Sequence, residues 1–191
     1  MTSSNPASAD NRWLLRYYSI RAIFSIVWIA LAVALGRESP SASLALLILY
    51  PAWDSVANFA DARRSGGLRS NPTQAFNFVI SAGAALAVTI AARLDSNTTI
   101  GVIGVWAGLS GIFQLATGIR RRRLAPGQWP MIISGAQSAL AGAFFVIQST
   151  GALHRLSAVD VAPYAGFGAL YFGLASAMLW LRGRRTAELP I

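Results

Sequence analysis

Two charged side chains lie inside long apolar stretches of the chain, where they are well placed to do chemistry. Arg21 and Asp54 fall in the first two stretches, on either side of a predicted turn between Arg37 and Pro40. If both stretches are helices and are mirrored across that turn, the two residues differ in depth by roughly 3 Å. An unpaired charge inside a membrane is expensive, and the similar depths leave an Arg21–Asp54 ion pair geometrically open.

Uncharged polar residues are predicted to lie near the same depth, in the cytoplasmic half of the membrane. Asn58 follows Asp54 by about one helical turn, so both side chains should point from one face into the bundle. Mirroring across the following turns brings further amides close to this level. The candidate polar layer comprises Arg21, Asp54, Asn58, Asn77, Gln114 and Gln137.

Two interpretations of this polar layer stay open. In the first, it is a satisfied network that fixes helix orientation, with interhelical hydrogen bonds of about 1 kcal/mol or less each. In the second, it is a protonatable or substrate-binding layer with Asp54 as its central acid. The chain has no P-loop, dinucleotide fingerprint or nucleophile elbow, and we predict no catalytic residue and no enzyme activity.

Six apolar stretches must position these residues, at 17–36, 41–62, 74–93, 98–119, 129–148 and 161–181. A bilayer core about 30 Å thick needs about 20 helical residues, and helices satisfy their backbone groups without water. We therefore predict an all-α integral membrane protein with six transmembrane helices within residues 13–185. Residues 1–12 are predicted to be a disordered cytoplasmic tail, and residues 186–191 a second cytoplasmic tail.

Composition narrows the classes of partner and cofactor. Only 12% of the residues are charged, about half the share in a soluble domain. The chain has no Cys and a single His, which excludes the usual zinc sites, so we predict no metal and no cofactor. That residue, His154, could sense external pH from its loop. The arginines lie at helix ends, so the net charge of +9 predicts contact with the lipid bilayer and not with nucleic acid.

Arginine placement predicts the topology. Of the 16 arginines, only Arg37, Arg93 and Arg155 fall on the side opposite the termini, so the positive-inside rule puts both termini in the cytoplasm. We expect Asp61 to pair with Arg63, Arg64 or another arginine of the first two stretches. The predicted cytoplasmic anchor comprises Asp61, Arg64, Arg120, Arg121, Arg122 and Arg123.

The stretches group into three helical hairpins, at about 13–64, 72–123 and 126–185, each ending in arginines. Aligning Arg64 with Arg120 and Arg182 gives steps of 56 and 62 residues. Each hairpin enters and leaves on the same side, so the repeats are parallel. Gly104 and Gly108 form a G-x-x-x-G pair that lets helices approach closely, either within one chain or in a homo-oligomer.

Three segments carry a family resemblance: WAGLSGIFQLATGIRRRR (106–123), GQWPMIISGAQSALAGAFFV (127–146) and YAGFGALYFGLASAMLWLRGRR (164–185). They resemble the HdeD-like family of small bacterial inner-membrane proteins. The resemblance implies a small integral membrane protein, linked in some members to acid stress, without established enzyme activity or agreed catalytic residues. The first hairpin departs from the pattern because it is more polar.

We therefore expect a non-enzymatic, HdeD-like protein in envelope or acid-stress physiology, acting through a homo-oligomer or a membrane protein partner. A small transporter or channel that uses the polar layer around Arg21 and Asp54 is the alternative. An intramembrane enzyme acting on lipid is the third hypothesis, and the missing catalytic residues count against it.

Overall fold

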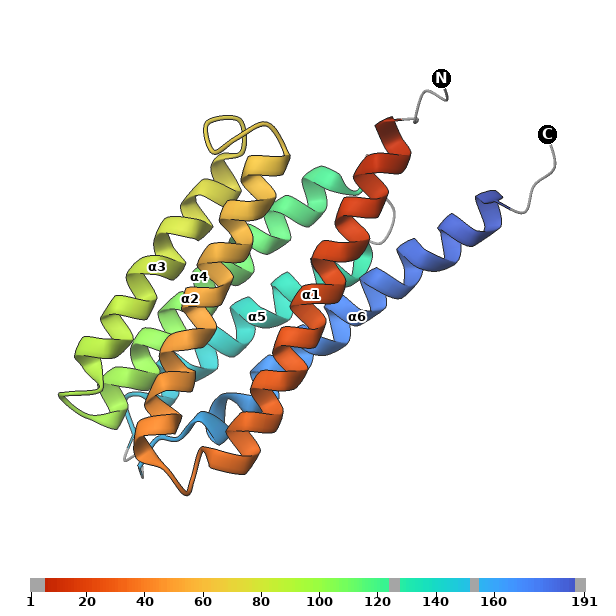
Figure 1. Ribbon diagram of the computed structural model, residues 1–191. Helices are drawn as coiled ribbons and strands as arrows, with labels where there is room; N and C mark the ends of the chain where they lie inside the picture. Colours follow the sequence, from red (N-terminus) through yellow and green to blue (C-terminus); the bar gives the residue numbers. More distant parts are fainter. Residues whose placement is uncertain (1–5, 124–127, 152–154, 188–191) are drawn as a thin grey trace.

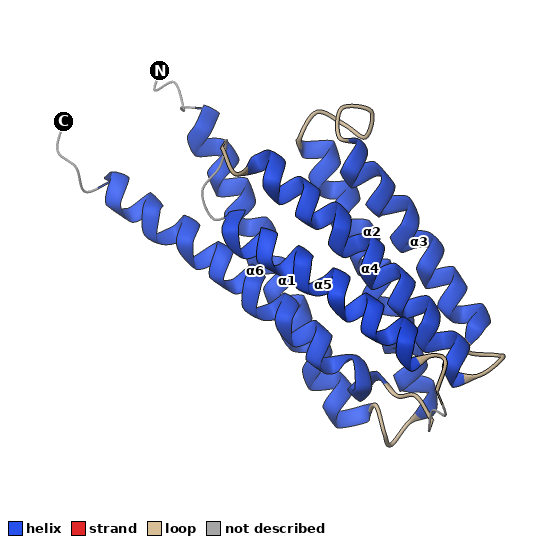
Figure 2. Ribbon diagram, turned by 180° about the vertical axis from the view of Figure 1, so that it is seen from behind, coloured by secondary structure: helices blue, strands red, loops and turns tan. Residues whose placement is uncertain are grey.

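The computed structural model describes residues 6–123, 128–151 and 155–187, and these residues form helices without any strand (Figures 1 and 2). The elements are α1 (Pro6–Leu35), α2 (Pro40–Arg64), α3 (Pro72–Ala91), α4 (Ser96–Arg121), α5 (Gln128–Gln148) and α6 (Ala158–Ala187). His154 and residues 1–5 and 188–191 of the predicted tails lie outside the described residues.

The helix starts follow local chemistry. Helices α2 and α3 begin with proline, whose fixed φ and missing N–H suit a first helical turn. Ser39 caps α2, and its side chain accepts a hydrogen bond from the backbone N–H of Ala42 at 3.3 Å. Asp95 caps α4 in the same way, accepting from the N–H of Thr98 at 2.7 Å. The turns between helices are therefore specified by their own residues.

The outer helix boundaries differ from the sequence prediction. Helix α1 begins at Pro6, so the part of the predicted disordered tail that the structure describes is helical. Proline suits the first position of a helix, and the alanines that follow are strong helix formers. Helix α6 likewise runs on to Ala187, past the predicted end of the membrane domain at residue 185.

The helices form a ring in chain order, which α1 and α6 close by packing side by side (Figure 1). The most extensive contacts join α2 to α3, α4 to α5 and α6 to α1, and α2 also touches α6 across the ring. Each predicted hairpin therefore packs mainly against its neighbours and less against itself. Both termini lie at one end of the bundle, here called the termini end, and the other end is called the opposite end (Figure 1).

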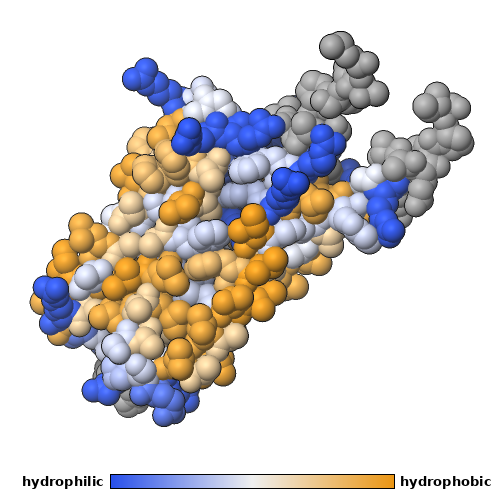
Figure 3. Space-filling model, viewed as in Figure 1, coloured by the Kyte–Doolittle hydropathy of each residue, from blue (hydrophilic) through white to orange (hydrophobic). Residues whose placement is uncertain are grey.

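The surface has the polarity of a membrane protein. Apolar side chains cover the middle of the molecule, and hydrophilic side chains gather towards its two ends (Figure 3). Five of the described helices, α1, α3, α4, α5 and α6, are long and apolar enough to cross a membrane. Helix α2 is not among them, because Asp54, Asn58 and Asp61 lower its hydropathy, yet all three are buried. The chain is thus a multi-pass membrane protein.

Glycines bring α4 and α5 into backbone contact. A Cβ atom on Gly142 would lie 2.3 Å from the backbone nitrogen of Gly108 and 2.6 Å from the carbonyl oxygen of Gly104. A Cβ atom on Gly104 would lie 2.8 Å from the backbone nitrogen of Val146. The G-x-x-x-G pair therefore packs within the chain, which is the first of the two uses that the sequence left open.

Candidate functional site

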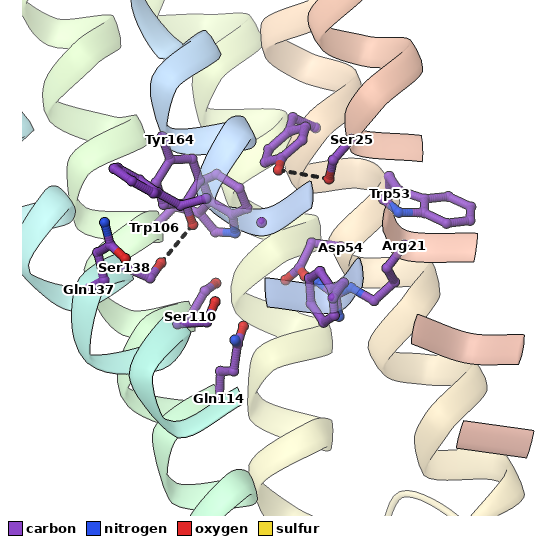
Figure 4. A pocket seen from close by; sticks show the side chains of 15 residues that line it. Arg21, Ser25, Trp53, Asp54, Trp106, Ser110, Gln114, Gln137, Ser138 and Tyr164 are labelled. Atoms are coloured by element: carbon purple, nitrogen blue, oxygen red, sulfur yellow. Dashed lines mark hydrogen bonds and ion pairs between the residues drawn. The ribbon is translucent and has the colours of Figure 1, made fainter. Parts of the chain in front are cut away.

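Arg21 on α1 and Asp54 on α2 form a direct ion pair inside the bundle, at the depth that the sequence predicted (Figure 4). Arg21 Nη2 donates to Asp54 Oδ1, and the two side chains are only 13% and 9% exposed. Arg21 Nη1 also donates to the hydroxyl of Tyr17 at 2.9 Å. The guanidinium carbon lies 4.2 Å from the ring centre of Phe172 on α6. The cation is therefore held by three helices.

The Asp54 carboxylate is compensated from three helices as well. Besides the bond from Arg21, Asp54 Oδ2 accepts hydrogen bonds from Ser81 Oγ on α3 at 2.8 Å and from Asn58 Nδ2 at 3.1 Å. Trp106 Nε1 on α4 donates to the same Ser81 hydroxyl at 3.0 Å. Charge-assisted bonds of this kind are among the strong ones, so the ion pair ties α1, α2, α3 and α4 together.

A small cavity of about 40 Å³, here called the central cavity, adjoins the ion pair (Figure 4). Its polar lining includes Arg21, Asp54, Ser110, Gln114 and Gln137. Ser110 Oγ is buried there and has no hydrogen-bond partner. One water needs about 10–15 Å³ of such volume, so the central cavity has the size and polarity for a few waters and not for a larger ligand.

A second cavity of about 40 Å³ lies nearer the termini end and is called the termini-side cavity. Its lining includes Asn58, Asp61, Asn77 and Gln114. Asn77 Oδ1 and Asp61 Oδ1 are both buried without a hydrogen-bond partner. Buried polar atoms are rarely left unsatisfied, so these oxygens also mark positions suited to ordered water.

The predicted polar layer is therefore divided between two cavities. Asp54 and Gln137 line the central cavity, whereas Asn58 and Asn77 line the termini-side cavity. Arg21 and Gln114 line both cavities and lie between them. Gln114 also donates to the carbonyl of Met131 at 3.4 Å. Comparing depths along the chain gave the approximate level but could not separate the two cavities.

Asp61 has a partner that the sequence did not predict. Its Oδ2 atom accepts from Arg121 Nη2 on α4 at 2.9 Å and from Gln74 Nε2 on α3 at 3.2 Å. The prediction had looked to Arg63, Arg64 and the other arginines of the first hairpin. Because α2 packs on α3 and α3 on α4, the buried face of α2 meets the second hairpin.

The predicted cytoplasmic anchor is accordingly not uniform. Arg121 points inward to Asp61, and Arg120 Nη2 donates to the side-chain oxygen of Gln74 at 2.9 Å. Arg120, Arg122 and Arg123 at the end of α4 are exposed, as is Arg64 at the last position of α2. Of the predicted arginines of the anchor, only Arg121 is half-buried.

Three serine–aromatic contacts were missed in the sequence. Each joins the first helix of a hairpin to its second: Ser25 with Tyr50 at 3.3 Å, Ser81 with Trp106 at 3.0 Å, and Ser138 with Tyr164 at 2.8 Å. The three rings meet one another inside the bundle. Their centroids are 5.9 Å apart for Tyr50–Trp106, 6.0 Å for Tyr50–Tyr164 and 5.9 Å for Trp106–Tyr164. The hairpins are therefore related by an approximate three-fold axis.

These contacts also correct the alignment of the repeats. Tyr50, Trp106 and Tyr164 are separated by steps of 56 and 58 residues, so the second predicted step of 62 is one helical turn too long. The alignment of the arginines gave the wrong second step because α6 extends further than α2 and α4. With a step of 58 residues, Met178 and not Arg182 corresponds to Arg120. Comparing the aromatic residues at these steps would have revealed the three-fold arrangement.

A family model matches part of the chain. No curated protein and no solved structure matches the chain. Within the described residues there is no group of three or more His, Cys, Asp or Glu side chains that could hold a metal ion. Residues 78–147, which run from α3 to α5, match the model of a family described as a short repeat of unknown function (DUF308), a family that includes HdeD-like membrane proteins.

Proposed function

We propose that this protein is a non-enzymatic, HdeD-like protein of the bacterial inner membrane that acts in envelope or acid-stress physiology. It works through a membrane protein partner or a homo-oligomer, with six spans and both termini in the cytoplasm. The match of residues 78–147 to the short-repeat family supports this proposal. The arginines gathered at the termini end support the orientation, because short cytoplasmic loops carry an excess of basic residues.

The observation that carries the non-enzymatic assignment is that hydrogen bonds from three side chains occupy the Asp54 carboxylate. Its carboxylate accepts hydrogen bonds from Arg21, Ser81 and Asn58. A carboxylate held in this way is committed to the ion pair and is poorly placed to take a proton from a substrate. The adjoining central cavity, at about 40 Å³, leaves no room for a lipid headgroup. Both features favour a structural network.

Helix α2 is the sixth span in this proposal. Its low hydropathy comes from side chains that face the bundle, whereas Leu49 and Val56 on its outer side are 44% and 57% exposed. A polar face turned inward and an apolar face turned outward are what a lipid-exposed helix of a bundle requires.

Topology and physiology can be tested separately. The chain has no cysteine, so single cysteines can report sidedness. We expect Arg122→Cys to react with a membrane-impermeant thiol reagent only from the cytoplasmic side, and Ser41→Cys, exposed at the opposite end, only from the other side. Reaction of both from one side would contradict six spans.

A deletion strain should lose survival in acid and regain it with the intact gene, and unchanged survival would refute the acid-stress role.

A small transporter or channel is the second candidate function. Two water-sized cavities, lined by the unpartnered atoms Ser110 Oγ, Asn77 Oδ1 and Asp61 Oδ1, favour it. The test is flux in proteoliposomes. Transport through the polar layer predicts that Asp54→Asn abolishes flux while the protein stays folded. A structural layer predicts lower thermal stability and no flux in either protein.

A further inference from the structure

One inward face of α2 recurs on α4 and at the start of α6, and its side chains agree in kind. Adding 56 to the residue numbers of α2 gives the α4 position, and adding a further 58 gives a position on α6 or, for Ser43, the residue directly before it. Three levels follow one another from the opposite end inward. The hydroxyl level is Ser43, Thr99 and Ser157; the aliphatic level is Leu47, Ile103 and Val161; the aromatic level is Tyr50, Trp106 and Tyr164.

The hydroxyl level lines a large open cavity. This vestibule, at the opposite end, has a volume of about 520 Å³, and all three hydroxyl residues border it. Two basic and two acidic side chains surround them, so the vestibule has no excess of either charge. These four are Arg37, Arg155, Asp95 and Asp160. Leu47 of the aliphatic level also borders the vestibule and forms its floor.

The aliphatic level is dry. Leu47, Ile103 and Val161 are 4%, 2% and 2% exposed and belong to one buried apolar cluster. Beneath it lie the three touching rings of the aromatic level, all of which border the central cavity (Figure 4). The two levels together separate the vestibule from the central cavity.

Polar cavities therefore lie on both sides of an apolar constriction, along the approximate three-fold axis of the bundle. Hydrophobic constrictions of this kind close membrane pathways by excluding water. On the termini side of the constriction, Ser110 Oγ, Asn77 Oδ1 and Asp61 Oδ1 line the cavities and are buried without hydrogen-bond partners, as expected of positions that bind water.

We propose that this axis is a pathway for water and small uncharged polar solutes, closed in this structure by the aliphatic and aromatic levels. This inference rests on the second candidate function and names its route and its class of solute. The class follows from the lining. Hydroxyls and amides offer hydrogen bonds to neutral molecules, and Arg21 and Asp54 neutralise each other, so neither cations nor anions are favoured.

The first experiment widens the constriction. Ile103→Ala combined with Trp106→Ala removes one side chain from each of the two levels. The matched control is Ile147→Ala combined with Phe144→Ala on α5, where both side chains face outward and are 71% and 61% exposed. In proteoliposomes, we expect the widened variant to raise water and urea permeability several-fold over the control, with sodium flux unchanged.

A second measurement does not depend on a large substitution. Single cysteines replace Ser96, a half-buried residue of the vestibule lining, and Ile103, which is 2% exposed and about two helical turns deeper. We expect Ser96→Cys to react with a membrane-impermeant thiol reagent and Ile103→Cys to stay unreactive. Reaction at both positions, or at neither, would overturn the closed constriction below an open vestibule.

The outcomes separate this inference from the function on which it rests. If the wild-type protein conducts neither water nor urea and the widened variant conducts both, transport is refuted as the function of the wild type. The same result supports the closed axial route. The route is wrong if the widened variant elutes as the wild type does but is no more permeable to water and urea than its control. A parallel rise in sodium flux overturns the class of solute.

Discussion

Removing the carboxylate of Asp54 should destabilise the bundle through the charge left behind on Arg21. Asp54→Leu deletes the ion pair while Arg21, with a side chain 13% exposed, stays inside. Breaking a buried ion pair by removing one partner costs about 3–5 kcal/mol. The Tyr17 hydroxyl and the Phe172 ring remain beside the guanidinium, so we expect the lower end, about 3 kcal/mol.

The double variant Arg21→Met with Asp54→Leu supplies the control. Replacing both charges with apolar side chains of similar size should bring the free energy of unfolding back to within about 1 kcal/mol of the wild type. The assay is unfolding in mixed detergent micelles, followed by far-UV circular dichroism, for the wild type, both single variants and the double variant. A double variant at least as unstable as Asp54→Leu would refute the assignment of the loss to an uncompensated charge.

Two further predictions concern the helix contacts and the caps. Gly142→Ala should cost about 3 kcal/mol, the upper end of the range for overpacking, because its Cβ would meet backbone atoms at 2.3 Å. Gly83→Ala, with no atom within 4 Å of its Cβ, should leave the free energy of unfolding in micelles unchanged or raise it; equal losses in both would contradict the close contact. At the start of α4, hydrogen bonds from the backbone N–H and the hydroxyl of Thr98 lower the pKa of the Asp95 carboxyl. Because the pKa of Asp95 is lower in the folded state, the ionised cap stabilises the protein at pH values above the pKa of the unfolded chain. This stabilisation is lost as the pH falls through the pKa of the folded chain. Thermal unfolding from neutral to acidic pH should therefore show a smaller acid loss in Asp95→Asn than in the wild type, and identical profiles would contradict it.

Features that depend on position along one helix could be predicted from the sequence. Apolar length identified the helices, and depth across a turn brought Arg21 and Asp54 together. Hydropathy alone is a poorer guide for α2, because it does not register that Asp54 and Asn58 face inward. Length and depth are measured along the helix axis, and the sequence carries them directly.

Features that depend on rotation about a helix or on neighbours in space could not be predicted in this way. The partner of Asp61 is Arg121, a residue from the next hairpin, because α2 packs against α3 more than against α1. The division of the polar layer between two cavities, and the meeting of Tyr50, Trp106 and Tyr164, likewise require the ring arrangement of the helices.

The closure of the ring by α1 and α6 has a consequence for biosynthesis. Helix α1 leaves the ribosome before α6, so it finds its main partner only when α6 has been inserted. Until then Arg21 lacks the Phe172 ring, and one flank of α1 faces lipid or an assisting insertase. A nascent chain stalled before residue 158 should therefore be a substrate for membrane proteases, even though its first two hairpins are complete.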